Sequence, residues 1–569
     1  MSDMKLVVIG GVTGGASAAA RLRRLDESAE IVMLERGDHV SFSNCCLPYH
    51  LSGTVADSES LILMDPKRFK AQHNIDARVN HEAVSIDRAK KEVLVREVRT
   101  GREYIESYDK LLLSPGLDPT PPEAVPGLDR AHVFMIHNVS DIRALKARAG
   151  QPGVEDAVVV GGGFIALEAA ENLRAAGKRV HLIVRRNQIA KNFDYDMVQI
   201  LHKELLDNGV DLRLRSNVTA IEADRVLVRT GDETTAIPAG LVVMATGGRP
   251  NTKLAVEAGL DIGETGGIWV NHNYQTSDPD IYAVGDAIES FNRLTRRPGR
   301  LALAGPAQRQ ARAAAGHMCG IPHSNRGFIG SSCVRLFGQN AASTGLGEIE
   351  ARAAGIPFDS VTVYPPDKVG LMPGSRYMVF KLLFEAPTGR ILGAQAIGRG
   401  AVDKRIDVVA AMLSMGGTLE DLKELELCYS PVFGTPKDVV NQAALVGLNV
   451  LYGATKQVHV TEVRRLVETG AYIVDVRNPG EFEAGHLKGA RNIPLPQLRE
   501  RLGEIPRDVP VYLHCRSSQR SYYALRILRG NGFGNVTNIS GSFLGICLYE
   551  YFDDVDGKRE PVVDRYNFN

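Results

Sequence analysis

Short apolar runs, each followed by a glycine-rich turn and an amphipathic stretch, organise the first half of the chain. KLVVI at 5–9 precedes such a turn and a helix-like segment that reaches about residue 25. The same order returns at 156–184, where DAVVV leads into GGGFIALEAAENLRAAGKRVHLIV. A buried strand, a tight turn and a helix, repeated in this way, predict two related βαβ units. We therefore expect two dinucleotide-binding domains with Rossmann-like, three-layer architecture.

The pattern changes in the second half of the chain. From about residue 327, alternating strand-like segments precede helical stretches at 401–424 and 437–449, which predicts a separate α+β domain. From about residue 460, YIVDVR, VPVYLHC and VTNIS alternate with helical segments, which predicts a small parallel α/β domain. The predicted fold class is therefore α/β. The predicted domains are 1–112 with 246–326, then 113–245, 327–450 and 451–569.

Composition narrows the class of protein without naming an activity. The 569 residues carry a formal net charge of zero, which gives no sign of a nucleic-acid partner. No apolar run reaches the roughly 18 residues that a membrane span needs, and the N-terminal segment lacks a secretory pattern. Seven scattered cysteines fit reactive or buried thiols better than a disulfide framework or a metal site. We expect a cytoplasmic protein with no membrane partner and no metal.

The first glycine-rich turn has the features of a dinucleotide site. It follows a strand and opens a helix, so backbone amides and the helix dipole can meet a pyrophosphate. Glu35, at the end of the next strand, can accept hydrogen bonds from a ribose. The alternative is a glycine-rich turn in some other α/β protein. The candidate cofactor-binding residues here are Gly10, Gly11, Gly14, Gly15, Glu35 and Arg36.

The second glycine-rich turn predicts a nicotinamide cofactor and favours one form of it. The following strand ends at Val184, where an acid usually selects NADH, and two arginines come next. Guanidinium groups pair with a 2′-phosphate, whereas an acid repels it. We therefore expect NADPH rather than NADH, the alternative being that the arginines are a solvated surface pair. The candidate residues are Gly161, Gly163, Ala166, Arg185 and Arg186.

Three further segments carry a resemblance to a known family. VGD at 284–286, ATGGRPN at 245–251 and VSFSNCCLPYH at 40–50 resemble the pyridine nucleotide–disulfide oxidoreductases, and the last resembles their coenzyme A–disulfide reductases. The resemblance implies that the first domain binds FAD, with Asp286 on the ribityl chain, and that the second binds NAD(P)H. It also implies that Cys45 is the nucleophile, at a helix N-terminus whose dipole favours the thiolate.

A single active-site cysteine needs a second thiol to store oxidising equivalents. In the resembled family that thiol is coenzyme A, held as a mixed disulfide. Cys46 departs from the family pattern and leaves three interpretations open. It is a buried small hydrophobe, a resolving thiol, or the partner of Cys45 in a strained vicinal disulfide.

The resemblance also implies positions that hold coenzyme A. Arg21 and Arg24 share a helical face and could grip phosphates, although they could equally be ordinary exposed arginines. The family places a tyrosine and a lysine of the partner subunit at the sulfur, so it implies a homodimer. Tyr364 matches a second such tyrosine less securely, and Cys428 is a further candidate thiol. The candidate residues are Ser17, Arg21, Arg24, Ser41, Asn44, Tyr429, Lys437 and Tyr364.

The last domain resembles a rhodanese, a sulfurtransferase fold. DVRNPGEFEAGHLKGARNIP at 475–494 and HCRSSQRS at 514–521 carry the resemblance. It implies that Cys515 accepts sulfane sulfur, while Arg516, Arg520, backbone amides and a helix dipole stabilise the persulfide anion. Ser518 stands where a glycine is often found, which leaves the choice of substrate open.

These features together predict an FAD-dependent NAD(P)H disulfide or persulfide oxidoreductase with a sulfurtransferase domain. Its expected substrates are coenzyme A disulfide, coenzyme A persulfide or polysulfide. One alternative is an NAD(P)H oxidase or peroxidase that uses the single cysteine as a sulfenate. The other is a sulfur-trafficking or redox-sensing protein with little turnover.

Overall fold

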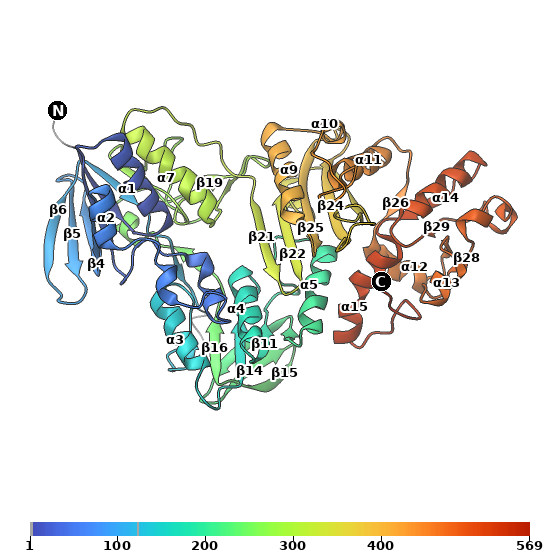
Figure 1. The fold of residues 1–569 in the computed structure, drawn as a ribbon, viewed down its shortest axis with the longest axis horizontal. Helices are drawn as coiled ribbons and strands as arrows, with labels where there is room; N and C mark the ends of the chain where they lie inside the picture. The colour runs from blue at the N-terminus through green and yellow to red at the C-terminus, as the bar shows by residue number, and fades with distance from the viewer. Residues whose placement is uncertain (1–3, 122–124, 569) are drawn as a thin grey trace. The chain divides into compact units, whose positions relative to one another are not determined.

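The computed structural model describes residues 4–121 and 125–568 (Figure 1). Its contacts divide the chain into two units. The first unit comprises Met1–Asn187 and Arg213–Phe328, and the second comprises Gln188–Leu212 and Ile329–Asn569. Segment 188–212 therefore packs with the second unit, although in sequence it lies inside the domain that we predicted over 113–245.

A five-stranded parallel sheet forms the centre of the first dinucleotide domain. Its order places the N-terminal strand in the middle, which is the arrangement expected of a doubly wound sheet. The strands run in the order β18 (Ile281–Ala283), β7 (Lys110–Leu113), β1 (Lys5–Ile9), β2 (Glu30–Glu35) and β3 (Asp76–Val79). The helices are α1 (Thr13–Leu25), α2 (Pro66–His73) and α7 (Ala304–Met318), with α1 packed against α7.

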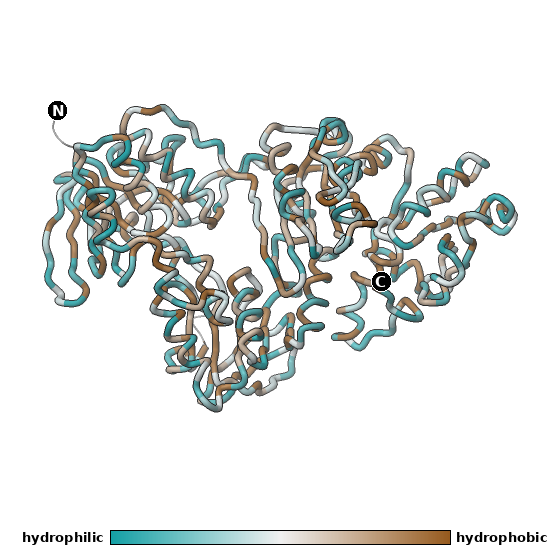
Figure 2. Tube along the Cα trace, viewed as in Figure 1, coloured by the Kyte–Doolittle hydropathy of each residue, from teal (hydrophilic) through white to brown (hydrophobic). Residues whose placement is uncertain are grey.

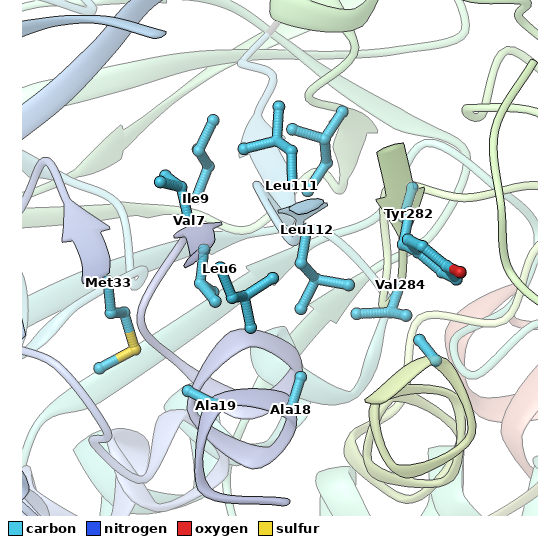
Figure 3. Close-up of a cluster of buried hydrophobic side chains, with 14 of the residues drawn as sticks. Leu6, Val7, Ile9, Ala18, Ala19, Met33, Leu111, Leu112, Tyr282 and Val284 are labelled. Carbon is cyan, nitrogen blue, oxygen red and sulfur yellow. The ribbon is translucent and has the colours of Figure 1, made fainter. Parts of the chain in front are cut away.

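The core of this domain explains why its central strand is apolar throughout. Figure 3 shows Leu6 and Leu112 on the side of the sheet that α1 covers, with Ala18 and Ala19 beneath them. Val7 points to the opposite side, so both faces of β1 are buried. Small side chains on α1 let the helix lie close to the sheet. Figure 2 shows the same tendency along the chain, with hydrophobic residues gathered in the inner strands.

A second five-stranded sheet forms the other dinucleotide domain. Its strands are β12 (Asp211–Arg213), β11 (Arg179–Ile183), β10 (Asp156–Val160), β16 (Leu241–Met244) and β9 (Val133–Phe134). Helix α4 (Phe164–Ala175) packs on β10, β11 and β16, and α3 (Val139–Ala149) follows β9. As in the first domain, a glycine turn joins the central strand to its helix.

Antiparallel strands and short connecting elements complete the first unit. Two three-stranded sheets are formed by β4 (His81–Asp87), β5 (Glu92–Glu97) and β6 (Glu103–Ser107), and by β13 (Ser216–Ile221), β14 (Arg225–Thr230) and β15 (Glu233–Pro238). The remaining elements are η1 (Asn44–Cys46), η2 (Pro48–His50), η3 (Ser58–Leu61), β8 (Leu117–Pro119), β17 (Gly248–Pro250), α6 (Lys253–Glu257), β19 (Ser290–Phe291) and β20 (Pro298–Gly299).

An antiparallel sheet covered by helices forms the α+β domain of the second unit. Its strands run in the order β21 (Ser331–Leu336), β22 (Gln339–Gly345), β25 (Ile391–Gly398), β24 (Met378–Glu385) and β23 (Phe358–Val363). The helices are α8 (Glu348–Ala354), α9 (Val402–Met415), α10 (Leu419–Glu424) and α11 (Val439–Leu451). Nearly every residue of β24 and β25 is buried, because helices and neighbouring strands enclose both.

A parallel five-stranded sheet forms the C-terminal domain. Its strands run in the order β26 (Gln457–Val458), β30 (Val536–Ile539), β29 (Val511–His514), β27 (Tyr472–Asp475) and β28 (Arg491–Asn492). The other elements are η4 (Val460–Glu462), α12 (Val463–Glu468), α13 (Pro479–Glu483), η5 (Leu495–Gln497), η6 (Leu502–Glu504), α14 (Gln519–Gly530) and α15 (Ser542–Asp556).

Helix α5 (Tyr195–Asp207) ties the two domains of the second unit together, and it lies beside α15 (Figure 1). The Tyr195 hydroxyl donates to the Asp553 carboxylate at 2.9 Å. The His202 ring packs on Phe552 with 4.7 Å between ring centroids. Within the part of the chain that the structure describes, no helix is long and apolar enough to cross a membrane, and no group of three or more His, Cys, Asp or Glu is placed to hold a metal.

Candidate active site

The first glycine turn brings backbone to backbone at the end of β1. Gly10 has φ +95°, and a Cβ added there would lie 2.1 Å from the carbonyl oxygen of Ser114. Only glycine fits such a position. Helix α1 begins three residues later at Thr13 and has no acidic side chain in its first turn, so its N-terminal amides and positive dipole end remain suited to an anion. Gly14 and Gly15 are buried within that turn.

Glu35 stands beside this turn. Its carboxylate accepts hydrogen bonds from the backbone N–H of Gly11 at 2.9 Å and of Gly37 at 2.8 Å. The acid is thus held at the glycine turn, at the place where a ribose hydroxyl would donate to it. The neighbouring Arg36 forms an ion pair with Asp118 at 2.7 Å.

Asp286 fits the role of a partner for hydroxyl groups. It follows β18 and is largely buried, and this burial, with no compensating charge or hydrogen bond, raises the pKa of its carboxyl to about 6. The adjacent Gly285 adopts φ +85°, and its N–H donates to Gln310 at 2.7 Å. A largely buried carboxylate with no donor among the described residues matches the hydroxyl-rich ribityl chain of a flavin.

The second glycine turn repeats the design. Gly161 has φ +137°, and a Cβ there would lie 2.1 Å from the carbonyl oxygen of Ala245. Gly163 caps α4, and Ala166 is fully buried beneath the turn. At the end of the next strand, Arg185 and Arg186 are exposed. Cations therefore stand where an acid would select NADH.

Cys45 is an exposed free thiol, but not at the N-terminus of an α-helix. The prediction of a helix dipole at Cys45 was wrong, because Asn44–Cys46 form a single 3₁₀ turn, too short to carry a macrodipole. Partial burial and then the nearby Glu168 carboxylate raise the pKa of the Cys45 thiol in the protein alone. Cys46 is also free, and it is half-buried.

Two residues absent from the sequence prediction complete the surroundings of Cys45. Tyr49 donates its hydroxyl to Glu168 Oε1 at 3.3 Å, linking the cysteine segment to α4. Burial, partly offset by this hydrogen bond and reinforced by Glu171, raises the pKa of Glu168 to about 7. A carboxyl of that pKa can hold or release a proton near neutral pH. The two partners lie 119 positions apart, so only the fold reveals them.

The predicted coenzyme A positions lie on α1 and on the segment beside its turn. Ser17, Arg21 and Arg24 are spaced four and three residues apart, so they share one face of the helix. The Nε atom of Arg21 is buried and has no partner among the described residues, whereas Arg24 is exposed. Ser41 donates its N–H to Gly11 at 2.8 Å and so adjoins the same turn. Asn44 is exposed.

The candidate residues of the partner subunit differ sharply in exposure. Tyr429 and Lys437 are exposed on the segment between α10 and α11, as is Cys428. Tyr364 is instead buried between two domains of its own chain, where its hydroxyl packs against Gly541 and Gly545. Burial raises the pKa of this phenol, and the position does not fit the catalytic role that we predicted for Tyr364. It is a packing residue of the domain interface.

The second thiol site lies at the end of β29. Cys515 is free and 1% exposed, and α14 begins four residues later. Ser518 caps that helix with φ +74°, the left-handed conformation that explains why glycine is common there. Arg520 forms a two-bond ion pair with Glu481, both bonds 2.7 Å long. Arg516 donates to the carbonyl oxygen of Asn567 at 2.9 Å.

A buried ion pair supports this loop from below. Asp475 and Arg477 are almost completely buried and bonded at 2.6 Å, and the guanidinium also stacks on Phe543 at 4.1 Å. Despite desolvation, the charges of His514 and Arg477 lower the pKa of Asp475. Burial lowers the pKa of His514, and the charge of the neighbouring Asp475 partly offsets this effect. Arg477 also donates to the carbonyl oxygen of Gly485 at 2.8 Å, and the Asp475 carboxylate lies 3.7 Å from the ring of His514, the residue before Cys515.

Comparison with known families identifies the domains that carry these sites. Residues 4–311, more than half of the chain, match the pyridine nucleotide-disulphide oxidoreductases. The chain belongs to this family. Residues 332–438 match the dimerisation domain of the pyridine nucleotide-disulphide oxidoreductases, and residues 459–548 match the rhodanese-like domain. The predicted resemblance and fold class are confirmed.

Individual relatives agree with this assignment. The coenzyme A disulfide reductase of Staphylococcus epidermidis is 30% identical over 77% of this chain and 98% of its own length. The structure of reduced Bacillus anthracis CoADR-RHD is 38% identical with a TM-score of 0.93, covering 98% of this chain and 99% of that one. An NAD-dependent persulfide reductase from A. fulgidus is 33% identical with a TM-score of 0.90, and the match covers 95% of this chain and 99% of that chain.

The candidate site residues fall into two groups, one in each unit of the chain. The first unit joins the two glycine turns, Glu35 and Asp286 with the segment that carries Cys45. The second unit joins the C-terminal thiol, Cys515, to its two arginines through the loop and α14. Those arginines already have protein partners, which the sequence could not show.

Proposed function

We propose that this oxidoreductase takes electrons from NAD(P)H through a bound flavin and reduces disulfide or persulfide sulfur at Cys45. We further propose that its rhodanese domain transfers sulfane sulfur at Cys515. The observation that carries the proposal is one exposed free thiol on the dinucleotide unit together with a second free thiol at the N-terminal end of α14. The names of the relatives, a coenzyme A disulfide reductase and a persulfide reductase, support it.

The protein residues that would hold the cofactors follow from the site. Gly10, Glu35 and Asp286 would hold FAD, and Gly161 with Arg185 would hold NADPH. A bound flavin supplies two-electron transfer between a nicotinamide and a disulfide. An engineered NADPH oxidase, 27% identical with a TM-score of 0.75, supports the second assignment, since its substitutions replace an aspartate by alanine and the next residue by arginine.

Cys45 would act as the nucleophile towards coenzyme A persulfide. Its thiolate attacks the sulfur bonded to the coenzyme A carbon chain, the S–S bond breaks, and hydrosulfide leaves, so that Cys45 and coenzyme A are joined in a mixed disulfide. Glu168, with a pKa of about 7, can hold the proton that the persulfide or the leaving thiol exchanges. The buried Nε of Arg21 would find its acceptor on a coenzyme A phosphate.

A homodimer would complete the site. The chain carries the dimerisation domain of its family, and Tyr429, Val432 and Phe433 expose 49%, 54% and 75% of their surface in the single chain. Exposed aromatic and aliphatic side chains of this kind are typical of an interface. We propose that Tyr429 of the partner subunit donates a hydrogen bond to the thiolate leaving Cys45, with Lys437 nearby.

Anaerobic turnover tests the proposal. The purified flavoprotein is given NADPH and coenzyme A persulfide, and NADPH oxidation and sulfide release are followed together. We expect one sulfide for each NADPH, loss of turnover in Cys45→Ser, and retained reductase turnover in Cys515→Ser. NADPH oxidation that requires oxygen and ignores the persulfide would establish the oxidase alternative instead.

A further inference from the structure

A buried serine hydroxyl points at the sulfur of Cys515. Ser521 lies in the first turn of α14, is completely buried, and donates its hydroxyl to Cys515 Sγ at 3.6 Å. The same hydroxyl lies 3.1 Å from the carbonyl oxygen of Ser518. Because a hydroxyl has one proton, Cys515 Sγ and this carbonyl oxygen compete for it. A negative charge on sulfur draws the proton to Sγ, whereas a sulfur bonded to a second sulfur leaves it with the carbonyl.

Two other serines hold this arrangement in place. Ser542 Oγ accepts the backbone N–H of Cys515 at 3.2 Å and lies 3.2 Å from Ser518 Oγ and 3.5 Å from Ser521 Oγ. Ser542 and Ser518 also donate to the carbonyl oxygen of Ile539 at 3.2 and 3.1 Å. Both have positive φ, 49° and 74°, which is unfavourable for serine. Two backbone positions are therefore held in unfavourable conformations, and their hydroxyls join Ser521, which bonds the sulfur, to the backbone N–H of Cys515.

We propose that Ser521 is a catalytic residue of the sulfurtransferase site, which stabilises the Cys515 thiolate by a hydrogen bond, and that Ser518 and Ser542 position it. The inference rests on the proposed function, since it concerns the sulfur that Cys515 carries. In the unloading step a thiolate or cyanide attacks the outer sulfur of the Cys515 persulfide. The S–S bond breaks, its electron pair stays on Cys515 Sγ, and the acceptor leaves with the outer sulfur. Ser521 donates to Sγ at the moment when the charge appears there.

The two half-reactions should respond differently to the loss of this donor. A stabilised thiolate is a better leaving group, so unloading depends strongly on Ser521. A stabilised thiolate is also a weaker nucleophile, so the hydrogen bond from Ser521 accelerates loading less than it accelerates unloading. A residue that only held the fold would slow both steps alike. This asymmetry separates a catalytic hydroxyl from a structural one.

The test uses the full-length flavoprotein and three variants. Ser521→Ala removes the hydroxyl, Ser521→Thr restores it, and Ser517→Ala is the matched control, a half-buried serine of the same loop with no hydrogen bond to Cys515. Cys515 is loaded with thiosulfate and discharged with cyanide in single turnovers. The pH dependence of Cys515 alkylation by iodoacetamide is measured by peptide mass. The charged and titratable groups around the loop are unchanged throughout; these are Arg477, Arg516, Arg520, Glu481, Asp475 and His514.

We expect Ser521→Ala to discharge about tenfold more slowly, the effect of one hydrogen bond to a charged group. Loading should change less, and the alkylation midpoint should move to higher pH, while Ser521→Thr and Ser517→Ala behave as the parent. Equal losses in loading and discharge with an unmoved alkylation midpoint would overturn the proposal. Failure of the parent to transfer sulfur would refute the proposed function instead, and the alkylation profile would still decide whether Ser521 acts on Cys515.

Discussion

Replacing Arg185 should change the nicotinamide that the enzyme prefers. Arg185 is exposed directly after Val184, which is 2% exposed and ends the strand that follows the second glycine turn. A guanidinium bonded to a phosphate contributes about 1.5–3 kcal/mol, and its exposure here favours the lower end. Because 1.4 kcal/mol corresponds to a factor of ten, Arg185→Ala should lower kcat/KM for NADPH about 10- to 30-fold. The value for NADH should stay within about twofold, since NADH has no 2′-phosphate.

The assay compares kcat/KM for the two nicotinamides with a saturating disulfide substrate. Arg179→Ala is the matched control, because Arg179 lies at the opposite end of the same strand and its guanidinium is paired with Asp156. The control should leave the ratio of NADPH to NADH unchanged, and Arg185→Asp should reverse it. A parent enzyme that prefers NADH, or an Arg185→Ala variant that loses equally with both, would refute the assignment.

Three further predictions concern substitutions of Glu168, Asp475 and His459. Glu168→Gln removes a carboxylate that raises the pKa of Cys45, so Cys45 should be alkylated faster at neutral pH. Asp475→Asn leaves a buried guanidinium unpaired and should destabilise the rhodanese domain by about 3–5 kcal/mol, measured as faster hydrogen exchange in β27 and β29. His459 is half-buried, yet the Asp359 carboxylate 3.6 Å from its ring raises the pKa of the imidazole, so this pair stabilises the second unit most below the ordinary histidine pKa of 6.5. The melting advantage of the parent over His459→Gln should therefore shrink as pH rises above neutral, measured by differential scanning calorimetry.

Each of these three has a contrary result. Unchanged alkylation in Glu168→Gln would mean that the carboxylate is protonated whenever Cys45 reacts. Parent-like exchange in Asp475→Asn would mean that the pair contributes no stability. A melting difference between the parent and His459→Gln that grows with pH would contradict the expected pH dependence. A histidine whose pKa is raised in the folded state stabilises the fold at low pH, and this stabilisation is lost at high pH.

The sequence predicted the parts of the fold that depend on local pattern. The glycine turns, the acid at the end of β2 and the two thiol segments were found because turn, strand and helix leave spacing that can be read directly. Helix α5 was missed as part of the second unit, because its partners are more than a hundred residues away. The pairing of Tyr49 with Glu168, the burial of Tyr364 and the contact of Ser542 with Cys515 are also long-range, and no periodicity in the chain encodes them.

The 3₁₀ turn at Cys45 is a second feature that the sequence did not predict. The segment NCCLPYH was expected to begin a helix, but proline at position 48 and two successive 3₁₀ turns interrupt it. The backbone at Cys45 therefore offers no α-helix dipole to favour a thiolate. This makes the state of that sulfur the most informative property of the purified protein.

The intact mass of the unreduced protein, with peptide mapping of Cys45, tests the central claim most directly. We expect a coenzyme A adduct on Cys45 that a reductant releases, with the Cys46 thiol free. A disulfide between Cys45 and Cys46, or between Cys45 and Cys428, would contradict the single-cysteine mechanism.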